Sequence, residues 1–225
     1  MMRTTRLIAL LVMMLPWLAA CSLPDFKSKA PAVVRWRLQP DPPPVAIDRP
    51  LPDNLVVDRV QVAPGLERDT LMILDPPSRY DFVANAAWPT DLPAYLRRQL
   101  LLDLAGSGHY ADVLGHARGE ARNWMLALRF ADFQIERTPS GPQVHLRAEA
   151  RLRPLKAGNH VLHRWYELRE PVGEMRMEAI SAAWNRAWGR FLRALQRGID
   201  AAMAADAPAS EEKVDHEVDK PATDA

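Results

Sequence analysis

The sequence is poor in the residue types that support thiol and nucleotide chemistry. Its 225 residues include a single cysteine, Cys21, so an intramolecular disulfide and a metal site made of several cysteines are both excluded. Glycine is scarce as well, at 10 residues. Neither the Gly-rich loop that binds nucleotide phosphates nor the glycine pattern of dinucleotide-binding folds occurs. No cofactor is therefore expected.

A strong excess of either charge sign is also missing, because the net charge of the whole chain is +1. Loss of a leader containing Arg3 and Arg6 would leave −1. The last twenty residues hold seven acids and two lysines, a net charge of −5, so the body of the chain carries +4. An excess this mild is unlike the clustered basic stripe of nucleic-acid-binding proteins. We expect no nucleic-acid partner and a single globular domain with an acidic tail.

Catalytic and metal-binding patterns are not found. His160 and His163 are three residues apart, which on a strand places them on opposite faces, so they cannot bind one metal ion together. Ser107 lacks the G-x-S-x-G pattern of hydrolases and follows an expected helix, which indicates a helix cap and turn. A hydrolase would need Ser107 to pair with His109 or His116 beside an oxyanion hole. The sequence therefore predicts a protein without enzymatic activity.

The first twenty residues have the pattern of an export signal. A short basic segment with Arg3 and Arg6 precedes the apolar run Leu7–Leu18, whose twelve residues are too few to span a bilayer as a helix. Small residues, Ala19 and Ala20, then stand directly before Cys21. An ordinary secretory signal with an incidental cysteine is the alternative interpretation.

The segment Leu18-Ala19-Ala20-Cys21 closely resembles the lipobox of bacterial lipoproteins. The resemblance implies that the Cys21 thiol receives a diacylglycerol and that residues 1–20 are a signal peptide removed before it. Several acyl chains on one residue give stable anchoring to a membrane. Ser22 follows, where lipoproteins retained in the inner membrane commonly carry Asp, so the resemblance implies the periplasmic face of the outer membrane.

Proline-rich stretches divide the mature chain. Residues 21–32 are polar, contain Pro24 and Pro31, and are expected to form a lipidated tether. A second stretch, Pro40–Pro52, is expected to be an extended spacer that does not contribute to the core. The folded domain is expected at residues 33–204. Residues 205–225 are acidic and lack periodicity, which indicates a disordered tail.

Hydrophobic patterns predict four early strand segments and a helix. The predicted strands are Val33–Leu38, at a sheet edge, Leu55–Val62, Leu71–Leu74 and Tyr80–Val83. Thr90 is the predicted N-cap of a helix of about four turns that ends at Gly106. The spacing of its leucines predicts that this helix lies against a sheet.

Strict alternation then predicts three long antiparallel strands with one wet face. The first has Trp124, Leu126, Leu128 and Phe130 on one side, the second alternates from Val144 to Arg153, and the third runs through Leu162 and Leu168. The wet face is expected to carry Arg147, Arg151, Arg153 and Arg164. Two interpretations stay open: a solvated sheet face, or a docking surface for an acidic partner or anionic lipid head groups.

A closing helix is predicted from about Met175 to Ala204. Its apolar stripe consists of Met177, Ile180, Trp184, Trp188, Phe191, Leu195 and Ile199. The stripe favours a core position, although its tryptophans leave room for a lipid-facing groove. The order of elements predicts an α+β fold with two helices on one face of a mainly antiparallel sheet.

Taken together, these features resemble the ABC-type transport auxiliary lipoprotein family, the group that includes paraquat-inducible protein C. The resemblance covers about Val33 to Ala204. It depends on the lipobox, the early strand Val34–Leu38, the Trp-x-x-x-Leu start of the first helix at Trp88 to Leu92, the long meander and the Ala-rich closing helix. The chain departs from the family in having Trp36 where paired tyrosines are common, in its Pro42-Pro43-Pro44 run and in its acidic tail.

The resemblance implies a non-catalytic outer-membrane subunit of an MCE-type ABC lipid transport system. Its partners would be an MCE-domain protein that bridges the periplasm and the transporter subunits, and ring-forming partners are compatible with a homo-oligomer. A second class stays open, because other outer-membrane lipoproteins of this size are plugs or assembly factors for β-barrels, including those of lipopolysaccharide export.

Overall fold

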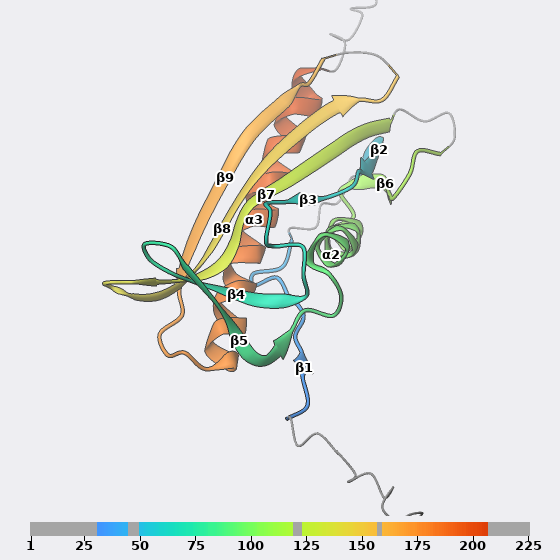
Figure 1. Cartoon of the computed structure of the whole chain (residues 1–225). Helices are drawn as coiled ribbons and strands as arrows, with labels where there is room; N and C mark the ends of the chain where they lie inside the picture. Colours follow the sequence, from blue (N-terminus) through green and yellow to red (C-terminus); the bar gives the residue numbers. More distant parts are fainter. Residues whose placement is uncertain (1–30, 45–49, 119–122, 157–158, 207–225) are drawn as a thin grey trace, which may run out of the picture. The chain divides into compact units, whose positions relative to one another are not determined.

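The computed structural model describes residues 31–44, 50–118, 123–156 and 159–206 (Figure 1). The expected signal peptide, nearly all of the expected tether with Cys21, and all but two residues of the expected acidic tail lie outside these ranges.

Within the described ranges the chain forms a mixed sheet of nine strands. In chain order the strands are β1 (Val34–Arg35), β2 (Leu51–Val57), β3 (Gln61–Val62), β4 (Thr70–Asp75), β5 (Arg79–Ala87), β6 (Tyr110–Leu114), β7 (Asn123–Thr138), β8 (Gly141–Pro154) and β9 (Leu162–Pro171). The longest ladders, β7 with β8 and β8 with β9, are antiparallel, as is β4 with β5.

Strand β7 pairs with other strands along both of its edges. One of its edges pairs with β8 from Trp124 to Thr138. The other edge takes three shorter strands in succession, all parallel to it: β2 at its start, β3 near Phe130 and β4 near Ile135. Outer strands extend the sheet, because β6 pairs with β2 and β5 pairs with β4. This arrangement makes β7 the element through which the early strands meet the meander.

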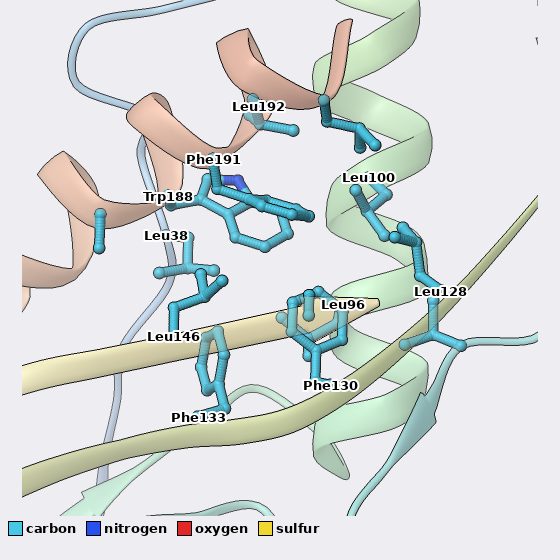
Figure 2. Close-up of a cluster of buried hydrophobic side chains, with 14 of the residues drawn as sticks. Leu38, Leu96, Leu100, Leu128, Phe130, Phe133, Leu146, Trp188, Phe191 and Leu192 are labelled. Atoms are coloured by element: carbon cyan, nitrogen blue, oxygen red, sulfur yellow. The ribbon is translucent and has the colours of Figure 1, made fainter. Parts of the chain in front are cut away.

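Two helices, α2 (Leu92–Gly106) and α3 (Met177–Ala205), pack on one face of the sheet. Figure 2 shows Leu96 and Leu100 of α2 and Trp188 and Phe191 of α3 meeting side chains of β7 and β8 in one core. The α+β fold with two helices on one face is thus confirmed.

The predicted apolar stripe of α3 is confirmed as core. Trp184, Trp188, Phe191, Leu195 and Ile199 are all at most 2% exposed. A hollow of about 10 Å³ adjoins Trp184, which is no larger than the space one water molecule needs. The described domain therefore packs these tryptophans against the sheet, and they line no groove of lipid size.

A polar contact ties the two helices together. The Trp188 indole Nε1 donates to Asp103 Oδ2 at 2.7 Å, and Gln99 Nε2 donates to the same carboxylate. Burial raises the pKa of Asp103 above its ordinary value, and the hydrogen bonds from Trp188 and Gln99 offset part of that effect. The carboxylate thus supplies the acceptor that a fully buried indole requires.

The cap of α2 differs from the prediction by one residue. Asp91, and not Thr90, is the N-cap, because its carboxylate accepts from the Ala94 backbone amide at 3.2 Å. Thr90 instead donates its hydroxyl to Asp91. The end of the helix at Gly106 is as predicted.

The predicted antiparallel meander is confirmed, and the predicted facing holds for β7 and β8. β7 carries a bulge between Phe130 and Asp132, which keeps both Phe130 and Phe133 on the core side. Opposite them the core side of β8 consists of Val144, Leu146, Ala148, Ala150 and Leu152, all fully buried. The other side of the three strands is called the outer face below.

The early strands differ from prediction in extent. Only Val34–Arg35 of the predicted Val33–Leu38 strand pairs, parallel to β5 and at an edge of the sheet, because Leu38 turns into the core with its amide donating to the Tyr95 hydroxyl. The predicted strand Leu55–Val62 is two strands. The break follows Val57, where the Arg97 guanidinium binds the carbonyls of Val57 and Asp58.

The second proline-rich stretch is not a free spacer where the structure describes it. The amides of Gln39 and Asp41 donate to the Asn185 side chain and carbonyl at 2.8 and 2.9 Å. Gly189 makes this approach feasible, because a Cβ there would lie 2.5 Å from the Pro42 carbonyl oxygen. The stretch also contains the start of β2 at Leu51.

One strand was not predicted at all. Residues Tyr110–Leu114 form β6, parallel to β2, although they follow the turn at Ser107 and show no clean alternation. The exposed and buried positions of β6 do not alternate, so no period of two marks it in the sequence. Predicted strands Leu71–Leu74 and Tyr80–Val83 exist and extend to Thr70–Asp75 and Arg79–Ala87.

Candidate docking face

The outer face of β7, β8 and β9 is the surface where the sequence-predicted arginines gather. Because residues directly opposite in an antiparallel pair share a face, the register places Arg147 beside Glu167, Glu149 beside Trp165 and Arg151 beside His163. The same rule places Arg153 beside Met125 of β7. Three of the four predicted arginines thus lie together on this face.

Arg164 is not on this face, which corrects the prediction. It lies opposite Ala150 and two residues before Tyr166, both of which face the helices. Burial raises the pKa of the Tyr166 hydroxyl, and the nearby Arg164 guanidinium acts to lower it. Arg164 is exposed, but on the side of the sheet that α3 covers.

An arginine stacked on a tryptophan occupies the edge of the outer face. The Arg147 guanidinium carbon lies 4.7 Å from the centre of the Trp165 ring, a cation–π geometry. Trp165 is 44% exposed, whereas Trp184 and Trp188 of α3 are buried in the core. Arg147 also lies 3.8 Å from Asp132. A large, rigid aromatic with an arginine on it is the kind of pair that dominates protein interfaces.

Glu149 organises the middle of the face. Arg151 donates to its Oε1 from Nε at 2.9 Å and from Nη2 at 2.6 Å, and His163 Nε2 lies 2.6 Å from the same oxygen. The hydrogen bonds from Arg151 lower the pKa of the Glu149 carboxyl, outweighing its desolvation, and the contact with His163 acts in the same direction. Glu149 therefore stays ionised and neutralises Arg151.

A second network lies toward the other end of the strands. The buried His145 ring lies 2.6 Å from Glu136 Oε1 and 3.1 Å from Glu167 Oε1, and Arg169 pairs with Glu167 at 2.8 Å. Desolvation is the largest influence on Glu136 and acts to raise its pKa, but the hydrogen bonds from His145 and Gln143 and the nearby positive charges lower it overall. The outer face is thus a mosaic of paired charges, and not the uniformly basic surface that the arginines alone suggested.

Unpaired arginines remain at one place on the outer face. A groove of about 270 Å³ between the β2–β3 connection and the strands β7 and β8 is lined by Arg59, Arg129 and Arg151 together with Asp58 and Glu149. Within the part of the chain that the structure describes, Arg59 and Arg129 make no hydrogen bond or ion pair, and Arg153 reaches only the Met125 sulfur, at 3.3 Å. This site is called the arginine groove below.

The candidate catalytic and metal-binding residues are not brought together. The Ser107 hydroxyl donates to the Leu104 carbonyl at 2.6 Å, as expected of a helix cap, while the His109 ring lies 3.3 Å from Asp200. His163 contacts Glu149, as described above. No group of three potential metal ligands forms among the described residues. Neither helix of the described domain is long and apolar enough to cross a membrane.

Sequence reasoning missed Trp165 as a functional candidate. A signal was present, because a tryptophan at an outward position of an alternating strand, with His163 and Glu167 as its neighbours on the same side, is out of place on a solvated face. The groove residues Arg59 and Arg129 carried no such signal, since one comes from the β2–β3 connection and the other from β7, and only the sheet topology brings them together.

Comparison with solved structures supports the fold. Protein XCC0632 from Xanthomonas campestris, of family model DUF330, aligns with a TM-score of 0.63 at 15% identity, over 76% of this chain and 99% of its own. An uncharacterized protein aligns with a TM-score of 0.60 at 17% identity, over 75% of this chain and 99% of its own. At such identities the likeness shows the fold alone.

No curated protein matches the sequence significantly. A family model does: the one described as ABC-type transport auxiliary lipoprotein component matches residues 36–196. The match spans the sheet from before β2 through β9 and most of α3. The chain therefore belongs to the ABC-type transport auxiliary lipoprotein family, as the pattern of its strands and helices predicted.

Proposed function

We propose that the protein is a non-catalytic subunit of an MCE-type ABC lipid transport system, which docks the periplasmic bridge at the outer membrane. The observation that carries the proposal is family membership, because an auxiliary lipoprotein component of a transporter has a supporting role beside the transporter itself. Its partners would be an MCE-domain protein and the transporter subunits.

The described domain fits docking better than lipid carriage. The aromatic side chains of α3 are buried in the core, and the hollow beside Trp184 is far too small for an acyl chain. The outer face instead presents Trp165, stacked with Arg147, in a setting of paired charges. An exposed anchor pair surrounded by polar groups is the composition of an interface with a central contact and a polar rim. We assign Arg147, Arg151 and Arg153 to this docking face, and Arg164 is left out because it lies on the other side.

The position in the cell would be set by lipid on Cys21. The lipobox pattern before Cys21 supports lipidation, and Ser22 at the next position supports transfer to the outer membrane. Eleven residues of extended tether from Ser22 to Ala32 would reach on the order of 34 Å. Tethering and docking would together hold the end of the bridge at that membrane.

The proposal is tested by crosslinking in cells followed by affinity capture of the tagged protein in detergent. We expect recovery of an MCE-domain protein with its transporter subunits, identified by mass spectrometry. The matched control is Cys21→Ser, which we expect to be lost from the membrane fraction and to recover much less of the partner. Recovery of a β-barrel without an MCE protein would contradict the proposal and favour the assembly-factor alternative. Membrane fractionation of processed Cys21→Ser would contradict lipid anchoring.

A further inference from the structure

The chain leaves the described domain at a defined end of the sheet. Helix α3 runs antiparallel to β9, because Arg186 and Arg190 near its start bind Glu170 at the end of β9. Near its other end, Gly198 lies against Leu162 and Tyr166, where β9 begins. Figure 1 shows the end of α3, in red, beside the end of β8 and the start of β9. Residues 207–225 therefore continue from this end of the sheet.

The arginine groove lies on the outer face toward the same end. Arg151 and Arg153 are among the last residues of β8, and Arg151 is directly opposite His163 at the start of β9. Arg129 of β7 and Arg59 of the β2–β3 connection complete the positive lining. Glu149 is already committed to Arg151 and His163, and Asp58, the other acid of the lining, makes no ion pair with these arginines. The guanidinium groups of Arg59, Arg129 and Arg153 therefore lack a paired carboxylate among the described residues.

The segment that follows α3 has the opposite charge. Residues 207–225 contain Glu211, Glu212, Asp215, Glu217, Asp219 and Asp224 against two lysines, a net charge of −4. Its 19 residues, called the acidic segment below, can span roughly 60 Å when extended. Neighbouring strands lie about 4.8 Å apart, so a path around the edge strand β9 to the groove over β7 and β8 is much shorter than this reach.

We propose that the acidic segment docks in the arginine groove of its own chain. Carboxylates of the segment would pair with the exposed Arg59 and Arg129 of the groove and with Arg153, a half-buried neighbour of Arg151 on the same face, without rearrangement of the sheet. Covalent linkage favours this occupant, because a short tether supplies an effective concentration on the order of millimolar. The segment would then cover part of the outer face, and an acidic partner would have to displace it. Docking of the segment within its own chain does not depend on which partner binds.

The test uses the mature chain from residue 21 with Cys21→Ser, so that Ala222→Cys supplies the one site for a nitroxide spin label. Paramagnetic broadening of amide NMR signals reports which surface the segment visits. At an ionic strength of about 0.01 M we expect the signals of Arg129, Arg151 and the Trp165 indole to lose most of their intensity. At about 1 M, where the Debye length falls from about 30 Å to about 3 Å, we expect the intensity to return.

Three variants make the test specific. Arg59→Gln with Arg129→Gln should abolish the broadening on the outer face, whereas Arg37→Gln with Arg98→Gln, which removes the same charge from exposed positions away from the groove, should preserve it. Replacing the six acids of the segment by Asn and Gln should abolish it as well, without touching the folded domain.

Broadening that is absent at low ionic strength, spread evenly over the domain, or unchanged in Arg59→Gln with Arg129→Gln would overturn the inference. Broadening that appears only when labelled chain is mixed with unlabelled, isotope-enriched chain would assign the groove to the segment of a second copy. That result would also overturn docking within one chain. Since no transport partner is present, none of these results bears on the proposed function.

Discussion

Side chains on the outer face differ in how much of their charge remains for a partner. Arg151 is held by Glu149 at 2.6 Å, and Arg169 by Glu167 at 2.8 Å, so both contribute more to the local structure than to a long-range field. The exposed Arg169–Glu167 pair contributes little to stability, about 0 to 1 kcal/mol. Arg147 is different, because it lies over an exposed indole and makes only a long contact with Asp132. Specific contacts at Arg147 and Trp165 are therefore expected to matter more for docking than the total charge.

At the same scale, Asp103 is predicted to matter for stability as the acceptor for Trp188. Asp103→Ala leaves the buried indole N–H without its partner, so we expect the free energy of unfolding to fall by about 1–3 kcal/mol. Asp103→Asn keeps an oxygen acceptor and is expected to lose much less. Urea unfolding at neutral pH distinguishes the two, and an equal loss in both variants would contradict the assigned role.

The pH dependence follows from the direction of the Asp103 pKa shift. Burial raises the pKa in the folded chain, so the folded state binds the proton more tightly than the unfolded state does. Wild-type stability should therefore decrease as the pH rises from the ordinary aspartate pKa of about 3.9 through the raised value. Asp103→Asn lacks this contribution, so its stability relative to the wild type should improve over the same interval.

Among the elements, α3 is predicted to require glycine where the segment Gln39–Pro44 crosses it. Gly189→Ala would place a Cβ 2.5 Å from the Pro42 carbonyl oxygen and 2.6 Å from the Asp41 carbonyl carbon. We expect a loss of about 1–3 kcal/mol from this overpacking, more than the gain of up to about 1 kcal/mol in helix propensity. The backbone amides of Gln39 and Asp41, which bond to Asn185, should exchange hydrogen faster.

The matched control for this prediction is Gly106→Ala at the end of α2. A Cβ at Gly106 would meet nothing within 4 Å, so the substitution should be neutral or stabilising by up to about 1 kcal/mol. Thermal unfolding and amide exchange measure both variants. If Gly189→Ala matched the control in both measurements, the close packing of the segment against α3 would be wrong.

Elements with strong periodicity could be predicted from the sequence, and elements fixed by distant contacts could not. Alternation in β7 and β8 and the apolar stripe of α3 determine facing directly, since each residue's side follows from its position. The division of Leu55–Val62 into β2 and β3 depends on Arg97, forty residues away in the chain. Strand β6 depends on the edge that β2 offers.

The candidate site was predictable to a similar degree. Arg147, Arg151 and Arg153 are an even number of residues apart in one strand, so their side chains lie on the same face. Arg164 is likewise two residues from Leu162 and from Tyr166, which already indicates the core side. The pairing of these arginines with carboxylates depends on β9 and β7 together, so the charge mosaic could not be read from one strand. The arginine groove depends on the topology, because β3 joins β7 across a long sequence separation.

For the whole molecule, one face of a single sheet is committed to the core and the other is open over the meander. Both helices lie on the core side, where they share one hydrophobic cluster with β7 and β8. This division leaves the outer face of β7, β8 and β9 as the surface through which a lipid-anchored subunit of this family could engage a partner. We expect the partner to bind on this outer face.

Photocrosslinking in intact cells tests whether the partner contacts the outer face. A photoreactive aromatic residue in place of Trp165 places the probe on the outer face, and the same residue in place of Leu102, an exposed apolar position on α2, is the matched control. We predict adducts with an MCE-domain protein from the Trp165 position and few or none from the Leu102 position. Equal adducts from both positions, or adducts from the Trp165 position to a β-barrel alone, would contradict the account.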